Sequence, residues 1–281
     1  MTTTPVLYEQ RDAVVLITLN RPDQANAQDS ELLYALDDAF HRFAQDDSAA
    51  VAILRGAGRH FSAGHDISPG GLADYERDYP RQGMWWNHVG KVGADNYLAR
   101  EQEVYLGFCR RWRELPKPTI AQVHGACIAA GLMLAWACDL IVAGESAKFA
   151  DPVIAMGAPG VEFFCHPWEM GPRRAKEFLF LGERITAAEA YEMGMLNHVY
   201  PDAELEERTF ELAEKIAKRA RLALALTKMA VNQAQDAMGH RTGIDSVFGL
   251  HQLAHVQNLV EMGTPNRGFD SAQTKRSMDG A

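Results

Sequence analysis

The stretch from His124 to Asp139 constrains the fold more than any other part of this chain. It reads His-Gly-Ala-Cys-Ile-Ala-Ala-Gly-Leu-Met-Leu-Ala-Trp-Ala-Cys-Asp and follows an apolar strand predicted over Thr119 to Val123. Small residues at this junction indicate a tight turn that leads at once into an apolar helix. The first N–H groups of a helix have no intrahelical acceptor, and the helix dipole favours negative charge in front of them. The junction therefore predicts a site for an anion or a polarised oxygen.

A second turn of small residues, from Phe61 to Asp66, follows another predicted strand over Val51 to Arg55. Two such turns that face each other would supply two backbone donors to a developing oxyanion. The sequence thus indicates where a carbonyl group would be activated.

Predicted strands and helices alternate in the first half of the chain. A helix is expected over Glu31 to Phe43, where apolar residues recur at helical spacing after Ser30. The predicted strands are almost wholly apolar and span Val14 to Leu19, Val51 to Leu54, Thr119 to Val123 and Leu140 to Val142. Apolar strands of this kind are typical of an α/β fold in which helices cover the sheet.

The alternation of predicted strands and helices is lost between Ser68 and Arg100, where aromatic residues lie among glycines and prolines. This segment suits a pocket wall or lid, and equally a surface excursion that packs its own aromatics. The chain becomes helical after Pro172. Thr186 and Glu189 predict a capping box, and helices are expected over Glu204 to Gln235 and Val247 to Met262.

Composition narrows the class of protein. The 281 residues allow one large domain or a domain with an appendage, and a formal charge of −9 argues against general nucleic-acid binding. The four cysteines form no paired motif and are expected to be reduced. The N-terminus lacks the regions of a signal peptide, and the apolar run from Ala126 to Cys138 is short for a membrane span. We expect a cytoplasmic protein.

The chain also carries four motifs in the order and spacing of one enzyme family. They are Asn20-Arg21-Pro22 with Asn26-Ala27; Phe61 to Ile67; Lys117-Pro118-Thr119 with Gly125, Gly131, Cys138-Asp139-Leu140, Ala143 and Phe149-Ala150; and Leu181 to Ala187 with Gly194 to Asn197 and Val199. Over residues 14 to about 235 the chain thereby resembles the crotonase, or enoyl-CoA hydratase/isomerase, superfamily.

The resemblance implies an α/β fold built as a spiral of ββα turns, with C-terminal trimerisation helices. Residues 1–200 would form the core with the thioester site, and residues 201–281 the helical region of a homotrimer or a dimer of trimers. The ligand would be a coenzyme A thioester, bound as substrate, with no permanently bound cofactor. The two oxyanion donors of the family map onto the backbone N–H groups of His65 and Ala130, where the second position is usually glycine.

The same resemblance assigns further residues to substrate and coenzyme A binding. They are Ala25, Ala63, Gly64, Asp66, Trp85, Trp86, Met133 and Val153. The last two mark a departure from the family, because Met133 and Val153 occupy the positions of the two glutamates with which hydratases activate water. Neither residue can move a proton, which puts the usual two-glutamate hydration in doubt.

The replacement candidate is Glu162, in a segment that lines the acyl pocket in the family. It falls close to the nucleophilic aspartate of 4-chlorobenzoyl-CoA dehalogenase and the acidic base of dienoyl-CoA isomerase. Its apolar neighbours predict a raised pKa suited to proton transfer. His166, four residues on, could be a second acid or base or could orient Glu162. The alternatives are a Glu162 that bonds the loop backbone and a structural His166, while Asp151 and Glu169 are expected in caps or salt bridges.

No metal site is predicted from the sequence. His251 and His255 lie four residues apart in a predicted helix, but the residues between them are Gln-Leu-Ala and lack the glutamate of a zinc protease.

Three functions remain open. The leading hypothesis is an enoyl-CoA hydratase/isomerase-type enzyme that forms an enolate at His65 and Ala130 and uses Glu162 as acid or base. With one carboxylate, isomerisation fits better than hydration. The second is a coenzyme A-dependent hydrolase or carbon–carbon bond cleaver for a bulky acyl group, and the third is a non-catalytic acyl-CoA-binding protein.

Overall fold

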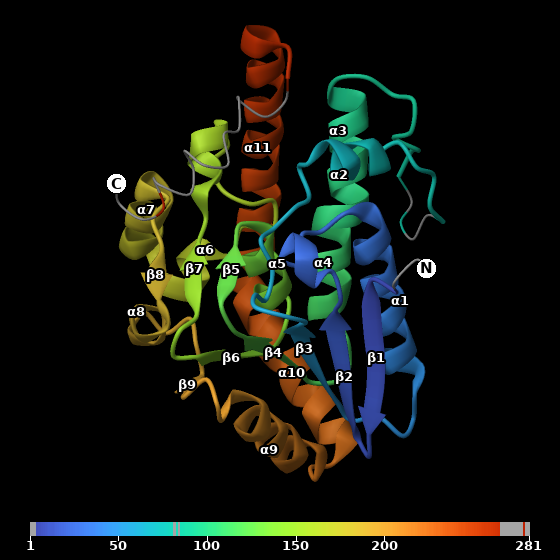
Figure 1. The fold of residues 1–281 in the computed structure, drawn as a ribbon, viewed down its shortest axis with the longest axis vertical. Coiled ribbons are helices and arrows are strands. Elements are labelled where there is room, and N and C mark those ends of the chain that lie inside the picture. Colours follow the sequence, from blue (N-terminus) through green and yellow to red (C-terminus); the bar gives the residue numbers. More distant parts are fainter. Residues whose placement is uncertain (1–3, 81–82, 84, 265–277, 279–281) are drawn as a thin grey trace.

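A six-stranded sheet lies at the centre of the computed structural model, which describes residues 4–80, 83, 85–264 and 278 (Figure 1). In spatial order its strands are β1 (Val6–Arg11), β2 (Val14–Leu19), β3 (Val51–Gly56), β4 (Thr119–Val123), β6 (Leu140–Gly144) and β9 (His198–Tyr200). The first two strands are antiparallel, and each later neighbouring pair is parallel. All residues of β2 and β4 are buried, as parallel strands covered on both faces should be.

A smaller sheet carries the turns of the site. It consists of β5 (Ala126–Ile128), β7 (Lys148–Ala150) and β8 (Ile185–Thr186). The chain passes from β4 to β5 through Gly125, whose φ is +56° and whose Cα approaches the Arg59 carbonyl so closely that a Cβ would stand 2.1 Å from its oxygen. Glycine is therefore required at this crossing between the two sheets.

Helices surround both sheets. They are α1 (Ser30–Gln45), α2 (Pro69–Asp74), α3 (Ala94–Arg100), α4 (Gly107–Arg113), α5 (Ala130–Trp136), α6 (His166–Met170), α7 (Pro172–Leu181), α8 (Ala187–Glu192), α9 (Leu205–Ala217), α10 (Arg221–Ala237) and α11 (His240–Met262). Short 3₁₀ turns span η1 (Pro22–Gln24) and η3 (Pro152–Met156), and a π-helical segment, η2 (Glu101–Leu106), joins α3 to α4. None of the helices in the described part of the chain is both long and apolar enough to cross a membrane.

Two apolar clusters form the core. The larger one contains α1, α4, α5 and the faces of β2 and β4 that point toward them. The smaller one lies between the opposite face of the sheet and α9, with Leu205 and Ala213 packed near Val14 and Ile53. The last helix, α11, packs against α10 and α3, and its far end stands at the top of the view in Figure 1.

The expected α/β architecture with a helical C-terminal region is confirmed, and so are the strand over Thr119–Val123 and the capping box of Thr186 and Glu189. Two boundaries were wrong. The apolar run from Ala126 begins with the strand β5, and its helix starts only at Ala130. The last helix, α11, begins at His240 rather than Val247. The expected helical region Glu204 to Gln235 comprises α9 and α10.

Candidate active site

The first predicted turn holds His65 with its backbone N–H turned outward. Gln28 pairs with His65 in a parallel bridge, in which Gln28 N–H donates to the Gly64 carbonyl at 2.8 Å and Asp66 N–H donates to the Gln28 carbonyl at 3.0 Å. Because these bonds use the residues on either side of His65, the N–H of His65 itself points away from Gln28.

The second predicted donor, Ala130, is the first residue of α5, where a backbone N–H has no intrahelical acceptor. The unusual backbone belongs to the preceding residue, Ala129, with φ 48° and ψ −119°. Ala130 is helical, so an alanine is tolerated there. The two turns are adjacent, because a Cβ on Gly64 would stand 3.2 Å from Ala130 N. His65 and Ala130 therefore lie in neighbouring turns, as a two-donor oxyanion hole requires.

Glu162 lies beside this pair of turns and is only 5% exposed. The His65 Nε2 atom donates to Glu162 Oε2 at 3.3 Å, and His251 Nε2 lies 3.4 Å from Glu162 Oε1. His65 thus contributes two groups to the site. Its backbone N–H lies in the first turn, and its imidazole contacts the Glu162 carboxylate. His251 comes from α11, about ninety residues further along the chain.

The electrostatics of Glu162 differ from the expectation. Burial raises the pKa of Glu162, but the charges of His65 and His251 together with the hydrogen bond from His65 outweigh burial and lower that pKa to about 2. The predicted raised pKa is therefore wrong. The sequence revealed the apolar neighbours of Glu162 but not the two imidazoles that the fold brings to it. Glu162 is therefore ionised at neutral pH.

His166 does not contact Glu162 through any hydrogen bond or ion pair among the described residues. It is fully buried and pairs with Asp151, with 2.9 Å between Nε2 and Oδ2. Asp151 Oδ2 also accepts a hydrogen bond from Val161 N–H at 3.0 Å. The buried Asp151–His166 pair therefore fixes the loop on which Glu162 sits, so that His166 acts on the loop rather than on the carboxylate.

A buried cation lies behind the His65 ring, and the sequence did not reveal it. His65 stacks on Tyr105 with 3.7 Å between ring centroids, and Tyr105 donates a hydrogen bond to the Tyr75 hydroxyl at 2.8 Å. Arg100 is 1% exposed, contacts the Tyr105 hydroxyl and lies over the Tyr75 ring at 3.5 Å. In the sequence, Arg100 is visible only as an arginine at the end of an aromatic segment. That position does not distinguish a buried cation from one on the surface.

Several predicted binding residues line the same region. Ala63 N–H donates to the carbonyl of Ala25 at 3.0 Å, so these two coenzyme A candidates are adjacent. Asp66 is paired with Arg21 at 2.9 Å and with Ser68, and it secures the first turn. Met133, on α5, is 2% exposed.

Val153 is 9% exposed and lies in η3, after the Asp151 cap. Trp85 and Trp86 stack on each other with 4.8 Å between centroids and are 39% and 46% exposed. The Trp86 indole donates to the Asp95 carbonyl on α3 at 3.1 Å. The two indoles therefore form a surface stack anchored on α3.

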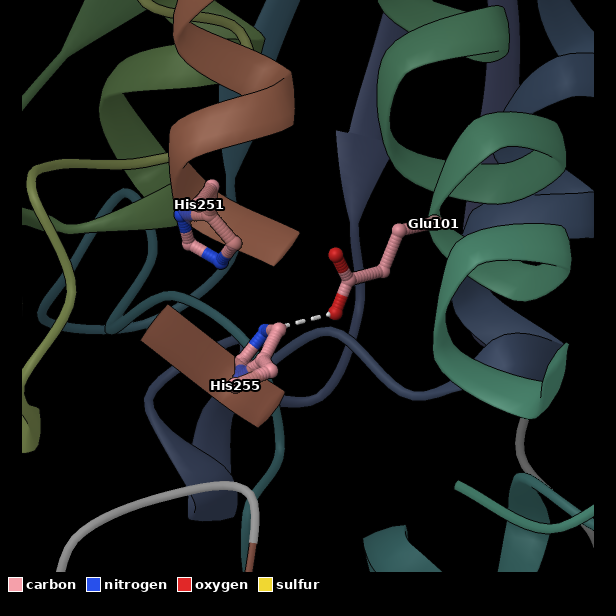
Figure 2. Close-up of side chains that lie close together, drawn as sticks. All are labelled: Glu101, His251 and His255. Carbon is pink, nitrogen blue, oxygen red and sulfur yellow. Dashed lines mark ion pairs between the residues drawn. The ribbon is translucent and has the colours of Figure 1, made fainter. Parts of the chain in front are cut away.

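A second buried cluster adjoins Glu162. Glu101, His251 and His255 place their ligand-type atoms within 4.8 Å of one another, and 2.9 Å separates His255 Nε2 from Glu101 Oε1 (Figure 2). Within the described part of the chain it is the one buried group of this kind. Motif reasoning found the two histidines but missed Glu101, which lies 150 residues before His251.

Known proteins are similar to this chain along most of its length. A family model described as enoyl-CoA hydratase/isomerase matches residues 9–92 and 90–264. A Mycobacterium tuberculosis protein provisionally named enoyl-CoA hydratase EchA13 is 46% identical over 258 residues, which are 89% of this chain and 80% of that protein. The 1,2-epoxyphenylacetyl-CoA isomerase of Escherichia coli is 31% identical over 82% of each chain. A crystal structure from Mycobacterium smegmatis, provisionally assigned as an enoyl-CoA hydratase, has a TM-score of 0.86 at 44% identity and covers 95% of this chain and 100% of its own.

Proposed function

Because this chain belongs to the enoyl-CoA hydratase/isomerase family and is an enzyme of that family, we propose that it polarises the carbonyl of an acyl-CoA thioester between the N–H groups of His65 and Ala130. The thioester oxygen would accept both N–H groups, which favours the enolate that forms when a proton leaves the carbon chain. Loss of one such donor typically costs about 3 kcal/mol of transition-state stabilisation.

The proton would move through Glu162 and His65 together. One observation carries this assignment: His65 contributes a donor to the oxyanion hole while its imidazole lies 3.3 Å from Glu162. The carboxylate is ionised and lies against the His65 imidazole, so the pair can accept a proton from one carbon and return it at another. Coenzyme A enters as part of the substrate, against the loop of Ala25 and Ala63.

Isomerisation of an enoyl-CoA double bond fits this geometry better than hydration. Hydration by the family's route needs a second glutamate to position water, and the positions in question hold the buried apolar residues Met133 and Val153. A single carboxylate–imidazole unit suffices to move a proton between two carbons.

Coenzyme A-dependent hydrolysis is the second candidate. The Glu162–His65 pair that supports isomerisation has the composition of a dyad that activates water. The two functions differ in product, because hydrolysis or bond cleavage changes the mass of the acyl-CoA and isomerisation leaves it unchanged.

The test is turnover of purified protein on trans-2- and 3-enoyl-CoAs of short, medium and long chain, followed by absorbance and product mass. We expect isomerised product of unchanged mass, and a loss of about 10²-fold or more in kcat for Glu162→Gln with retained acyl-CoA binding. Glu204→Gln, at an exposed position, is the matched control and should behave as the parent.

Equal turnover by Glu162→Gln and the parent would contradict the role of Glu162. If the protein adds water to the substrate and this depends on Glu162, the reaction is hydration rather than isomerisation. Cleavage of the acyl-CoA would favour hydrolysis. Tight binding without turnover on any of these substrates would contradict both acyl-CoA reactions tested here.

A further inference from the structure

In the cluster of Glu101, His251 and His255, only His251 contacts Glu162, yet all three residues place ligand-type atoms close together. We propose that these three residues bind a divalent transition-metal ion of zinc's class, next to Glu162. Two imidazoles and one carboxylate are a donor set that zinc takes in proteins, with a fourth position left open. The proposal does not depend on the acyl-CoA reaction.

The residues converge from two elements. His251 and His255 lie four positions apart in α11, so both side chains leave the same face of the helix. Glu101 opens the π-helical segment η2, which lies across from that face (Figure 2). π-Helical turns are rare and occur often at functional sites. All three side chains are buried, with exposures of 4% to 6%.

The spacing suits a metal after a small adjustment. The ligand atoms lie within 4.8 Å of one another, and His255 Nε2 lies 2.9 Å from Glu101 Oε1. In a tetrahedral site with bonds of about 2.0–2.1 Å, ligand atoms stand roughly 3.3 Å from each other. The His255–Glu101 contact must open slightly and the others close by up to about 1.5 Å, which side-chain rotation can supply.

The tautomer of His251 is fixed in the form that binds metals. Its Nδ1 lies 2.8 Å from the Gly160 carbonyl, and because a carbonyl can only accept, Nδ1 carries the hydrogen. The Nε2 atom therefore faces the cluster, where Figure 2 shows a ring nitrogen turned toward Glu101 and His255. A hydrogen bond from the remote ring nitrogen to a backbone carbonyl is the usual support of a metal-bound histidine.

A cation would suit the charges in this place. Glu162 Oε1 lies 3.4 Å from His251 Nε2, and Glu101 lies on the other side of the two histidines. Two buried carboxylates this close are balanced either by protons on the histidines or by a metal ion. Arg100 contacts Tyr75, Tyr105 and Ser30, and its charge also acts on Glu101. A divalent ion in place of the protons would balance both carboxylates at once.

The experiment measures metal in the full chain, purified without a polyhistidine tag or chelator. We expect about one Zn²⁺ per chain by elemental mass spectrometry, or stoichiometric Zn²⁺ uptake by calorimetry after dialysis against EDTA. The ion should also raise the midpoint of thermal unfolding, because it binds only the folded chain. Glu101→Gln and His255→Gln should each weaken Zn²⁺ binding at least tenfold.

The matched control is His240→Gln, which changes a buried histidine at the start of α11 outside the cluster and should keep parental Zn²⁺ affinity. Parent protein that neither contains nor takes up a divalent ion would overturn the proposal and leave protons to bridge the cluster. Equal Zn²⁺ affinity in the parent and both cluster variants would overturn it as well. Metal content needs no substrate, so failure of the acyl-CoA reaction leaves this result intact.

Discussion

The buried histidines of this protein differ in the charged and aromatic groups that they contact. His65 and His251 lie against a carboxylate, and their charge keeps Glu162 ionised. His240 lies among Phe163, Trp168 and the Cys165 thiol, and its Nδ1 is 3.6 Å from Asp236 Oδ1. Burial and the nearby charge of Arg113 outweigh Asp236 and lower the pKa of His240 to about 4. The same residue type thus has different surroundings in the fold, and the sequence alone does not show them.

The His240 environment predicts a pH dependence of stability. Its pKa is lower in the folded chain than the ordinary 6.5, so the unfolded chain takes up a proton first as pH falls from 6.5 to 4. Stability should therefore fall across this window, by roughly 3 kcal/mol at most from this group. Urea unfolding at pH 4.5 and 7 should show a smaller difference for His240→Gln than for the parent. The exposed His198→Gln should keep the parental difference, and an unchanged slope in His240→Gln would contradict the assignment.

At the scale of elements, the site depends on two turns that tolerate little beyond small residues. Gly64 has φ +94°, and a side chain there would enter the space in front of Ala130 N–H. Ala129 holds a backbone conformation that L-residues rarely adopt, at φ 48°. Strain of this kind costs about 1–3 kcal/mol and persists only where the surroundings impose it. Here it sets the angle at which α5 presents its first N–H.

Gly64→Ala should separate backbone strain from obstruction of the oxyanion hole. We expect a loss of about 10²–10³-fold in kcat, as for removal of one donor, and a loss of about 1–2 kcal/mol in stability. Gly194→Ala is the matched control, because Gly194 has φ +90° and open space around its Cα. It should keep kcat and lose less stability than Gly64→Ala, because a Cβ on Gly64 also stands 2.9 Å from the Ile128 carbonyl oxygen. Equal activity of the two variants would contradict an oxyanion hole at Gly64 and Ala130.

At the scale of the whole molecule, α10 and α11 expose apolar side chains that a monomer would leave in water. Leu222, Val231, Leu253 and Val260 are 62% to 77% exposed. Apolar faces of this kind mark contacts between proteins. We expect copies of this chain to cover them, in the trimer or dimer of trimers that the sequence predicts. Light scattering should give three or six times the chain mass of 31.1 kDa, and a monomer at micromolar concentration would contradict this.

The sequence predicted the parts of the fold that local patterns encode. The strand Thr119–Val123, the capping box at Thr186 and the small-residue turns each depend on neighbours in the chain. Contacts between distant segments were missed, because no periodicity links Glu162 to His251 or Glu101 to His255. The raised pKa expected for Glu162 failed for the same reason: burial is visible in the sequence, whereas a charge that arrives from another element is not.

The position of His251 in α11 has a consequence for biosynthesis. The oxyanion turns, His65 and Glu162 leave the ribosome within the first 162 residues, whereas His251 follows about ninety residues later. The nascent chain therefore carries Glu162 and His65 before the second imidazole exists, and His251 reaches the carboxylate only when the last helix docks. A product that ends before α11 would hold the carbonyl-binding turns and the Glu162–His65 pair without His251, so the surroundings of the carboxylate are complete only after translation to near the C-terminus.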